Sequence, residues 1–261
     1  MSFVKKSFGV VFVLLLMVGM TACSSEGGTY DEVMERGYIE FSMSGGYPPF
    51  NYYNDDGELV GFDVEIAEEV ANRLNVESKP VTAPFDGLIF GLQTGDFDGI
   101  LGSMAITEDR KENVSFSNPY YYSGAQIFVR EDSDINGIDD ITDSHQVAVV
   151  IGTTFEDVVA ETGAEIVPLE DDAEVLRQLD SGDVDAIVTD YLVGIINIEE
   201  QGFDFRPAGE FLYTEEMAVA FRQGDDELVK AVNQALEDMM EDGTYKEISN
   251  SYFGTDISEP R

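Results

Sequence analysis

Two residues of opposite charge, Arg110 and Asp190, each follow a short apolar segment and together offer sites for a zwitterion. The guanidinium of Arg110 presents N–H groups in a fork that matches a carboxylate. The carboxylate of Asp190 is a natural partner for an ammonium group. An α-amino acid carries both charges, so a ligand of this class would fit between the two residues. Taken alone, Arg110 is equally compatible with a surface arginine at a charged helix start.

Hydroxyl groups and backbone amides near these charges add hydrogen-bond donors. Ser103 and the amides that follow it, including that of Ala105, precede the arginine, and Thr189 lies beside the aspartate. Between them, IGTTFED predicts a strand end followed by an acidic helix start with Thr154 in its first turn. Amides at a helix N-terminus attract negative charge, so Thr154 is expected to hold the same carboxylate as the arginine.

Two aromatic residues are predicted in turns beside strand ends. Tyr47 stands in GGYPPF and Phe85 in APFDGL, outside the helical apolar stripes. Ligand pockets are commonly lined by aromatic rings, so both are interpreted as walls of the site. The alternative is that they only cover the core.

The elements that must position these residues include a repeat. LQTGDFDGIL, residues 92–101, and LDSGDVDAIV, residues 179–188, align at a constant offset of 87 residues. Each copy predicts a helix ended by a glycine, Gly95 or Gly182, and then a short buried strand. Parallel α/β sheets bind ligands beyond the carboxyl ends of their strands, so the residues after each copy are expected to meet. Two unrelated helix–strand units would explain the glycine and aspartate but not the shared register.

Other patterns outline the remaining elements. A short helix is predicted from Tyr30 to Glu35 and a strand in YIEFSMS. The segment GFDVEIAEEVANRLN shows helical spacing, with Asp63 placed to cap its first turn. NDDGE predicts a hairpin turn, because the ligand spacing of a calcium loop is not met there. A C-terminal helix carries Leu228, Val232 and Met239 on one face.

Charge and composition exclude some classes of function. The chain has 261 residues, 43% of them hydrophobic, with 53 acidic and 14 basic residues and a formal net charge of −39. Such a field repels nucleic acid. Acidic pairs such as Asp171 and Asp172 scatter along the chain, which predicts a solvated acidic surface suited to a saline environment. His145 is the single histidine and Cys23, the single cysteine, lies in the predicted tether, so a zinc site is not expected. No other cofactor is expected.

The N-terminus predicts export. Lys5 and Lys6 precede an uncharged apolar run, residues 8–20, that is too short to span a bilayer. Residues 1–22 are interpreted as a signal peptide, Cys23 as a site of lipid attachment, and residues 23–37 as a tether and short helix. The protein is therefore expected on the outer face of the cytoplasmic membrane, held by lipid alone, or in the periplasm. The alternative is an ordinary cleaved signal.

A set of motifs in fixed order resembles one known family across the mature chain: YPPFNYY, GFDVEIAEEVANRL, FDGLIFGLQTGDFDGI, ITEDRKENVSFSNPYY, IGTTFEDV and EDGTYKEISNSYFG. These motifs are similar to those of the polar amino acid binding proteins of ABC uptake systems, family 3 of the solute-binding proteins. The resemblance implies an α/β, two-lobed periplasmic-binding-protein-like fold (type II), in which each lobe is a central sheet flanked by helices and two hinge strands cross. Lobe one would comprise residues 38–122 plus 219–255, and lobe two residues 126–214.

The resemblance also implies roles for residues. Arg110 matches the arginine that binds the ligand carboxylate and Asp190 the aspartate that binds the amine. The other implied contacts are a carboxylate contact at Thr154, aromatic walls at Tyr47 and Phe85, and a backbone contact to the amine at Ser103. Ala105 stands where many relatives carry a serine or threonine, Ser44 where several basic-ligand relatives carry an acid, and Val150 at a position that is sometimes basic.

The implied function is binding of one free amino acid and its delivery to ABC transporter permease subunits, by a monomer that is not an enzyme. With Ser44 in place of an acid, a neutral or polar amino acid is expected over a basic one. Two alternatives stay open. A dehydratase on the same scaffold would need a general acid with a raised pKa in the cleft, and a sensory protein docking a receptor would share every residue named.

Overall fold

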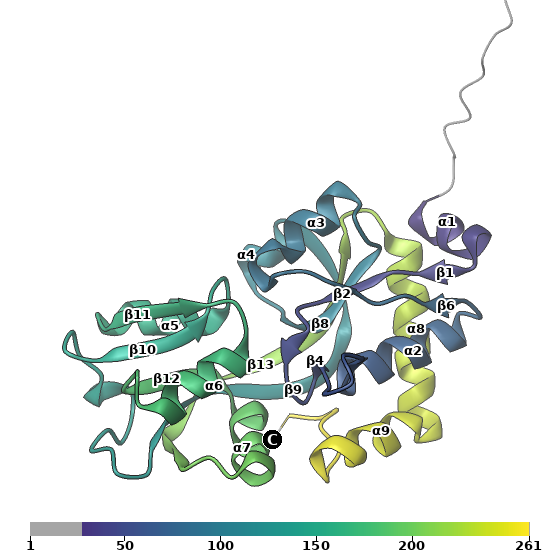
Figure 1. The fold of residues 1–261 in the computed structure, drawn as a ribbon. Coiled ribbons are helices and arrows are strands. Elements are labelled where there is room, and N and C mark those ends of the chain that lie inside the picture. Colours follow the sequence, from purple (N-terminus) through teal and green to yellow (C-terminus); the bar gives the residue numbers. More distant parts are fainter. Residues whose placement is uncertain (1–27, 261) are drawn as a thin grey trace, which may run out of the picture.

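Residues 28–260 are described by the computed structural model. The predicted signal peptide, Cys23 and the first residues of the predicted tether lie outside this range. Figure 1 shows two lobes joined by two long strands, β9 (Val114–Arg130) and β13 (Phe205–Arg222). The predicted two-lobed α/β fold is therefore confirmed, while the residue limits of the lobes remain a prediction. The limits proposed from the sequence fall inside β9 and β13.

One sheet of eight strands runs through both lobes, in the order β11-β10-β12-β9-β13-β8-β2-β7. β9 and β13 pair antiparallel along almost their whole length, from Phe205 opposite Arg130 to Arg222 opposite Val114. One sheet thus extends through both lobes, although the pairing of β9 with β13 is irregular in places, whereas the family resemblance implied a separate sheet in each lobe. The sheet is shared because the crossing strands pair with each other, while β9 also pairs with a strand of lobe two and β13 with a strand of lobe one.

Lobe one holds the N-terminal and C-terminal segments. Its helices are α1 (Thr29–Arg36), α2 (Phe62–Arg73), the 3-10 turn η1 (Phe85–Gly87), α3 (Leu88–Thr94), α4 (Glu108–Lys111), α8 (Asp226–Asp242) and α9 (Thr244–Phe253). Its strands are β1 (Tyr38–Ile39), β2 (Phe41–Met43), β3 (Gly46–Tyr47), β4 (Asn51–Tyr53), β5 (Leu59–Val60), β6 (Glu77–Ser78), β7 (Val81–Thr82) and β8 (Gly99–Ala105).

Lobe two is built from the central part of the chain. It contains η2 (Ile138–Asp140), β10 (Gln146–Val150), α5 (Thr154–Thr162), β11 (Glu165–Leu169), α6 (Asp172–Ser181), β12 (Ala186–Asp190) and α7 (Tyr191–Gln201). Apolar residues from β9, β10 and β12, among them Ile127, Val149 and Val188, are buried between the sheet and its helices.

The predicted repeat is confirmed. α3 ends at Gly95 and α6 at Gly182, and both glycines adopt the left-handed conformation, with φ of 83° and 78°. The strands that follow, β8 and β12, occupy equivalent places: each pairs parallel with a strand of its own lobe and antiparallel with one crossing strand. The two copies therefore lie on opposite sides of the β9–β13 pair.

Several smaller predictions can be compared with the structure. α1 ends at Gly37, β4 and β5 form the predicted hairpin, and the C-terminal helix α8 buries its predicted face. The prediction for Asp63 was wrong: the cap position of α2 is Gly61, with no side-chain cap. Asp63 is instead fully buried and accepts hydrogen bonds from Asn51, Ser103 and Tyr120 at 2.7–2.8 Å.

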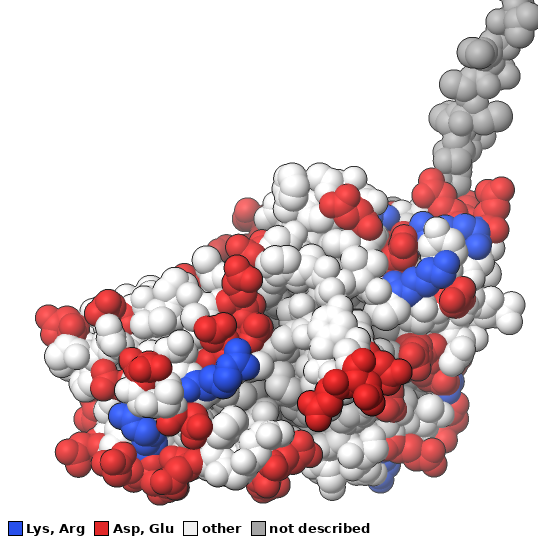
Figure 2. Space-filling model, in the orientation of Figure 1, with Lys and Arg blue, Asp and Glu red and all other residues white. Residues whose placement is uncertain are grey.

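Acidic side chains lie over both lobes on the face in Figure 2, with few basic side chains among them. The view agrees with the scatter of acidic residues along the sequence. Asp172 is an exception, because its side chain is buried and the residue is 5% exposed. Between residues 28 and 260, none of the helices is both long and apolar enough to cross a membrane.

Candidate functional site

A cavity with an empty volume of about 450 Å³ lies between the lobes. Six of the seven residues that the sequence places most firmly in the site line it, and so does Ser44. The lining comprises Ser44, Tyr47, Phe85, Gly102, Ser103, Ala105, Arg110, Val150, Thr153, Thr154, Phe155, Glu170, Asp171, Asp172, Glu215 and Met217. Asp190 and Thr189 are both fully buried and are not among these residues.

Arg110 reaches across the cavity from α4. Thr107 begins that helix by accepting a hydrogen bond from the backbone amide of Arg110. The guanidinium donates from Nη1 to the carbonyl of Ala105 at 2.9 Å and from Nη2 to the carbonyl of Gly152, in lobe two, at 3.2 Å. Because arginine has five N–H groups, three remain for an anion. Burial lowers the pKa of Arg110, and the nearby Glu215 opposes that shift.

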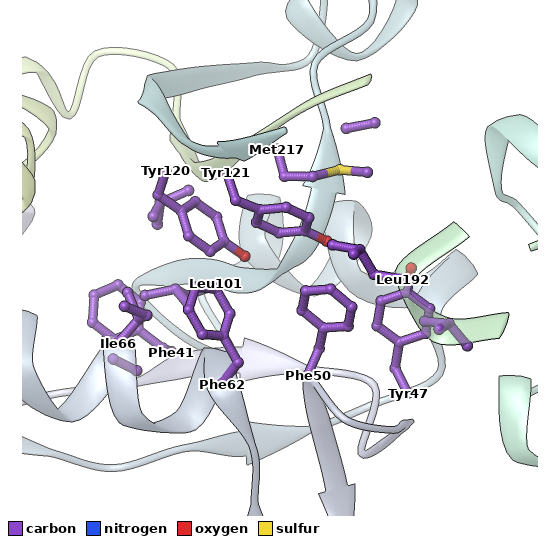
Figure 3. Close-up of a cluster of buried hydrophobic side chains, with 14 of the residues drawn as sticks. Phe41, Tyr47, Phe50, Phe62, Ile66, Leu101, Tyr120, Tyr121, Leu192 and Met217 are labelled. Atoms are coloured by element: carbon purple, nitrogen blue, oxygen red, sulfur yellow. The ribbon is translucent and has the colours of Figure 1, made fainter. Parts of the chain in front are cut away.

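Phe85 and Tyr47 stand at two walls of the cavity. The centre of the Phe85 ring lies 5.5 Å from the guanidinium carbon of Arg110, within the range of a cation–π contact. Tyr47 lies in β3, where a turn was expected, and its ring stacks on Phe50 with 5.1 Å between centroids. In Figure 3, Tyr47 is at the edge of an aromatic cluster and close to Leu192 of lobe two. Both rings are therefore held in place by packing.

Ser103 and Ala105 end β8 at the cavity. Ser103 has a φ of 57°, a left-handed conformation that non-glycine residues rarely adopt. Its hydroxyl donates to Asp63 at 2.8 Å and its amide to the Tyr120 hydroxyl at 3.0 Å, so both groups are occupied inside lobe one. The buried Asp63 thus fixes the conformation of the strand end. An ammonium is a donor, so the amine contact predicted for Ser103 requires an acceptor, which the carbonyl oxygen of Ser103 supplies.

Thr154 begins α5 as predicted, but its hydroxyl already has a partner. Thr154 Oγ1 donates to Glu215 Oε1 at 2.5 Å. The sequence analysis missed Glu215, which lies on β13 and is 6% exposed. Its second oxygen, Oε2, is buried and has no hydrogen-bond partner in the part of the chain that the structure describes. Burial raises the pKa of Glu215, while the hydroxyl of Thr154 and the charge of Arg110 act in the opposite direction.

Asp190 caps α7 at the end of β12. Its Oδ1 accepts from the amide of Leu192 and from the hydroxyl of Ser123 on β9, both at 2.7 Å. Its Oδ2 is buried with no hydrogen-bond partner. Burial raises the pKa of Asp190 to about 7. Burial raises the pKa of Tyr47, and the charge of Asp190 is the largest cause after burial.

Thr189 does not line the cavity but binds a residue that does. Its hydroxyl donates to Oδ1 of Asp172 at 2.6 Å, and Asp172 is the first residue of α6. Asp172 lines the cavity, and burial raises its pKa to about 7. The sequence analysis had assigned Asp172 to the solvated surface. Its place at a helix start, shortly after a strand that ends at Leu169, was the signal that could have located it at the cavity.

Contacts between the lobes close the cavity on several sides. Besides the bond from Arg110 to Gly152, the side-chain amide of Asn197 in lobe two donates to the carbonyl of Pro48 at 3.2 Å. At another edge, a Cβ added to Gly46 would lie 2.3 Å from the Cβ of Asp171. Only glycine at position 46 therefore permits this approach of the lobes.

The arrangement combines a guanidinium, a helix N-terminus, aromatic walls and buried carboxylates. These groups can hold a small molecule with an anionic end and a cationic end. Among the described residues, no group of three or more His, Cys, Asp or Glu side chains has the geometry of a metal site. The carboxylates are thus not arranged around a common point for a cation such as Ca²⁺.

Curated relatives resemble the chain over nearly its full length. The L-cystine-binding protein TcyJ of Escherichia coli is 32% identical over 254 residues, which cover 95% of each chain. The probable amino-acid-binding protein YxeM of Bacillus subtilis is 34% identical over 260 residues, which cover 97% of each.

Solved structures agree with these relatives. The crystal structure of the ancestral amino acid-binding protein AncCDT-1, a precursor of cyclohexadienyl dehydratase, superposes with a TM-score of 0.82 at 35% identity and covers 87% of this chain and all of that one. Residues 39–255 also match the sequence profile of the bacterial extracellular solute-binding proteins, family 3. With the cleft, the relatives and the profile in agreement, the chain belongs to family 3 of the bacterial extracellular solute-binding proteins.

Proposed function

We propose that the protein binds one free amino acid in this cleft, outside the cytoplasm, and delivers it to the permease subunits of an ABC importer. The observation that carries the binding assignment is the position of Arg110, whose guanidinium lines the cavity with three N–H groups that have no hydrogen-bond acceptor among residues 28–260. Membership of the solute-binding family supports the transport role.

In the proposed complex, each end of the ligand is held by groups from both lobes. The α-carboxylate would lie against Arg110 and the N-terminal amides of α5, because the hydroxyl of Thr154 is already donated to Glu215. The α-ammonium would take the free Oδ2 of Asp190 and the carbonyl of Ser103. Tyr47 and Phe85 would enclose the rest of the ligand.

The two crossing strands supply the hinge. We place it where the strands pass between the lobes, at residues 122–126 of β9 and 214–219 of β13, so that lobe one comprises residues 38–122 plus 219–255 and lobe two residues 126–214. β9 and β13 lose their regular register between Ala208 and Tyr213 and again between Met217 and Ala220. Irregular pairing of this kind lets a strand bend. Opening the lobes there would admit the ligand, and closure would bury it.

The experiment that tests amino-acid binding is a thermal-shift screen of the common amino acids on the purified mature protein, followed by calorimetry. At least one amino acid is expected to raise the melting temperature, because a ligand that binds only the folded state stabilises it. Mass analysis of the recovered ligand is expected to show it chemically unchanged, since we propose a binding protein and not a dehydratase. No shift and no heat for every amino acid would refute the proposal, and a converted ligand would favour the enzyme.

We further propose that Cys23 carries lipid and holds a monomeric protein at the outer face of the cytoplasmic membrane. The apolar run before it and the polar SSEGGT after it support this assignment. Cys23→Ser is expected to move the protein from the membrane fraction to the soluble fraction, with ligand affinity unchanged. Metabolic labelling with a fatty acid checks the modification directly. Stable anchoring needs more than one acyl chain. Equal membrane association of Cys23→Ser and wild type would contradict the assignment.

A further inference from the structure

Two buried carboxylates, on Glu215 and Asp172, line the cleft in addition to the predicted zwitterion contacts. They come from different parts of the molecule: Glu215 from the crossing strand β13 and Asp172 from the first turn of α6. Their residues are 6% and 5% exposed, respectively. Charged side chains are rarely buried to this extent without a partner of opposite charge.

The protein provides neither carboxylate with an ion pair. Among the described residues, no lysine, arginine or histidine nitrogen lies within 4.0 Å of a carboxylate oxygen of Glu215 or Asp172. Each accepts one hydrogen bond from a threonine hydroxyl, and Oε2 of Glu215 has no hydrogen-bond partner within residues 28–260. A buried carboxylate oxygen in this situation is an acceptor that a donor on the ligand can satisfy.

Both carboxylates line the same cavity as Tyr47. Burial raises the pKa of Tyr47, and the charges of Asp190, Asp172 and Glu215 raise it further. Burial also raises the pKa of each of these carboxyl groups, while their hydrogen bonds, and for Glu215 the charge of Arg110, act in the opposite direction. Glu170 and Asp171 add further negative charge toward solvent at the same end of the cavity as Ser44.

The charge balance of the cleft then favours one class of ligand. Arg110 is the sole lysine or arginine among the described residues that line the cavity. A zwitterion with a neutral side chain adds no net charge and leaves Glu215 and Asp172 uncompensated. An amino acid with a cationic side chain contributes one more positive group and an additional set of N–H donors.

We propose that Glu215 and Asp172 form a subsite for a second cationic group, so that the preferred ligand is an amino acid with a positively charged side chain. This inference rests on the proposed function, because it assigns the side-chain end of the same cleft. It reverses the expectation of a neutral ligand drawn from Ser44. That expectation assumed that Asp190 is the one acid that serves the cleft. The premise is wrong, because Glu215 of β13 and Asp172 of α6 also line the cavity.

The test compares arginine with citrulline, which has nearly the same shape and carries a neutral ureido group instead of the guanidinium. Calorimetry on the wild-type protein is expected to show arginine binding about 10- to 100-fold more tightly, the effect of a hydrogen bond to a charged group in a buried site. Glu215→Gln and Asp172→Asn are each expected to lower the ratio of arginine affinity to citrulline affinity, and the double variant to bring it close to one. The binding of citrulline itself is expected to change little.

Glu216→Gln is the matched control, because Glu216 is the exposed neighbour of Glu215 on β13 and the substitution removes the same charge. It is expected to leave the ratio unchanged. Thermal melts of each variant verify that it folds. Citrulline or glutamine binding the wild type as tightly as arginine would overturn the cationic subsite and leave amino-acid binding intact. Failure of every amino acid to bind would instead overturn the proposed function.

Discussion

Replacement of Arg110 by alanine is expected to weaken amino-acid binding by on the order of 2–5 kcal/mol, because it leaves the ligand carboxylate buried and unpaired. Arg110 is the group best placed to meet that carboxylate. It lines the cavity, lies under the ring of Phe85, and donates only to the carbonyls of Ala105 and Gly152. Calorimetry with the tightest-binding amino acid measures the loss directly.

Two further variants separate the charge of Arg110 from its geometry. Arg110→Lys keeps the positive charge but loses the planar fork, so an intermediate affinity is expected. Lys111→Ala is the control: Lys111 is the next residue of α4, its side chain is 50% exposed, and it pairs with Glu108 at the surface. This control is expected to bind like wild type. If Arg110→Ala also binds like wild type, Arg110 only bridges the lobes and the ligand carboxylate lies elsewhere.

The repeat explains why much of the fold could be predicted from the sequence. Gly95 and Gly182 mark helix ends that need a left-handed backbone, and the strands after them begin with apolar residues because both strands are buried along their whole length. Such local requirements are written in residue type and spacing. They located β8 and β12, and hence the side chains that follow these strands.

The missed parts depend on long-range packing. Nothing local distinguishes Glu215 from its neighbour Glu216, since both belong to the same acidic pair in the crossing strand. Only the alternation of side chains along β13 turns the first into the cavity and the second to solvent. The failed prediction for Asp63 has the same origin: a capping position is judged from neighbouring residues, but the partners of Asp63 come from three separate segments.

Asp190 shows a further limit. The sequence places it correctly at the end of β12, yet its fully buried side chain is held by Ser123 of β9 and by the first turn of α7. Those groups bind one carboxylate oxygen, and the other, Oδ2, has no hydrogen-bond partner among the described residues. The protein thus binds Oδ1 of Asp190, and we expect the ligand ammonium to donate a hydrogen bond to Oδ2.

Asp190→Asn is accordingly the second substitution expected to have a large effect on binding. Asparagine keeps an oxygen acceptor for Ser123 and for the amide of Leu192, so the capping of α7 is preserved, but the negative charge is lost. The cost to amino-acid affinity is expected to be on the order of 2–5 kcal/mol, because the ligand ammonium is then buried without a counter-charge.

The pH dependence of ligand affinity tests whether Asp190 binds the ligand ammonium. Burial raises its pKa to about 7 in the unliganded protein, so below that pH the carboxyl group is mostly neutral and cannot pair with an ammonium. The affinity of wild type is expected to rise as pH increases from 5 to 8, by up to about tenfold per pH unit for this group, and then to level off. Asp172 and Glu215 add to the rise for a cationic side chain. In Asp190→Asn, the slope measured with citrulline, which has no such side chain, is expected to be shallower.

As pH rises, the stability of the unliganded protein is expected to fall while its ligand affinity rises. Because the folded-state pKa of Asp190 lies above its unfolded value of 3.8, the folded state binds the proton more tightly, and the wild type loses stability as pH rises from about 4 to 7. Asparagine has no charge to bury, so Asp190→Asn is expected to be more stable than wild type at pH 8, relative to pH 4. Denaturant melts at both values measure this difference. Weaker binding together with greater stability at pH 8 marks Asp190 as a ligand group, whereas loss of both would show that its charge serves only the fold.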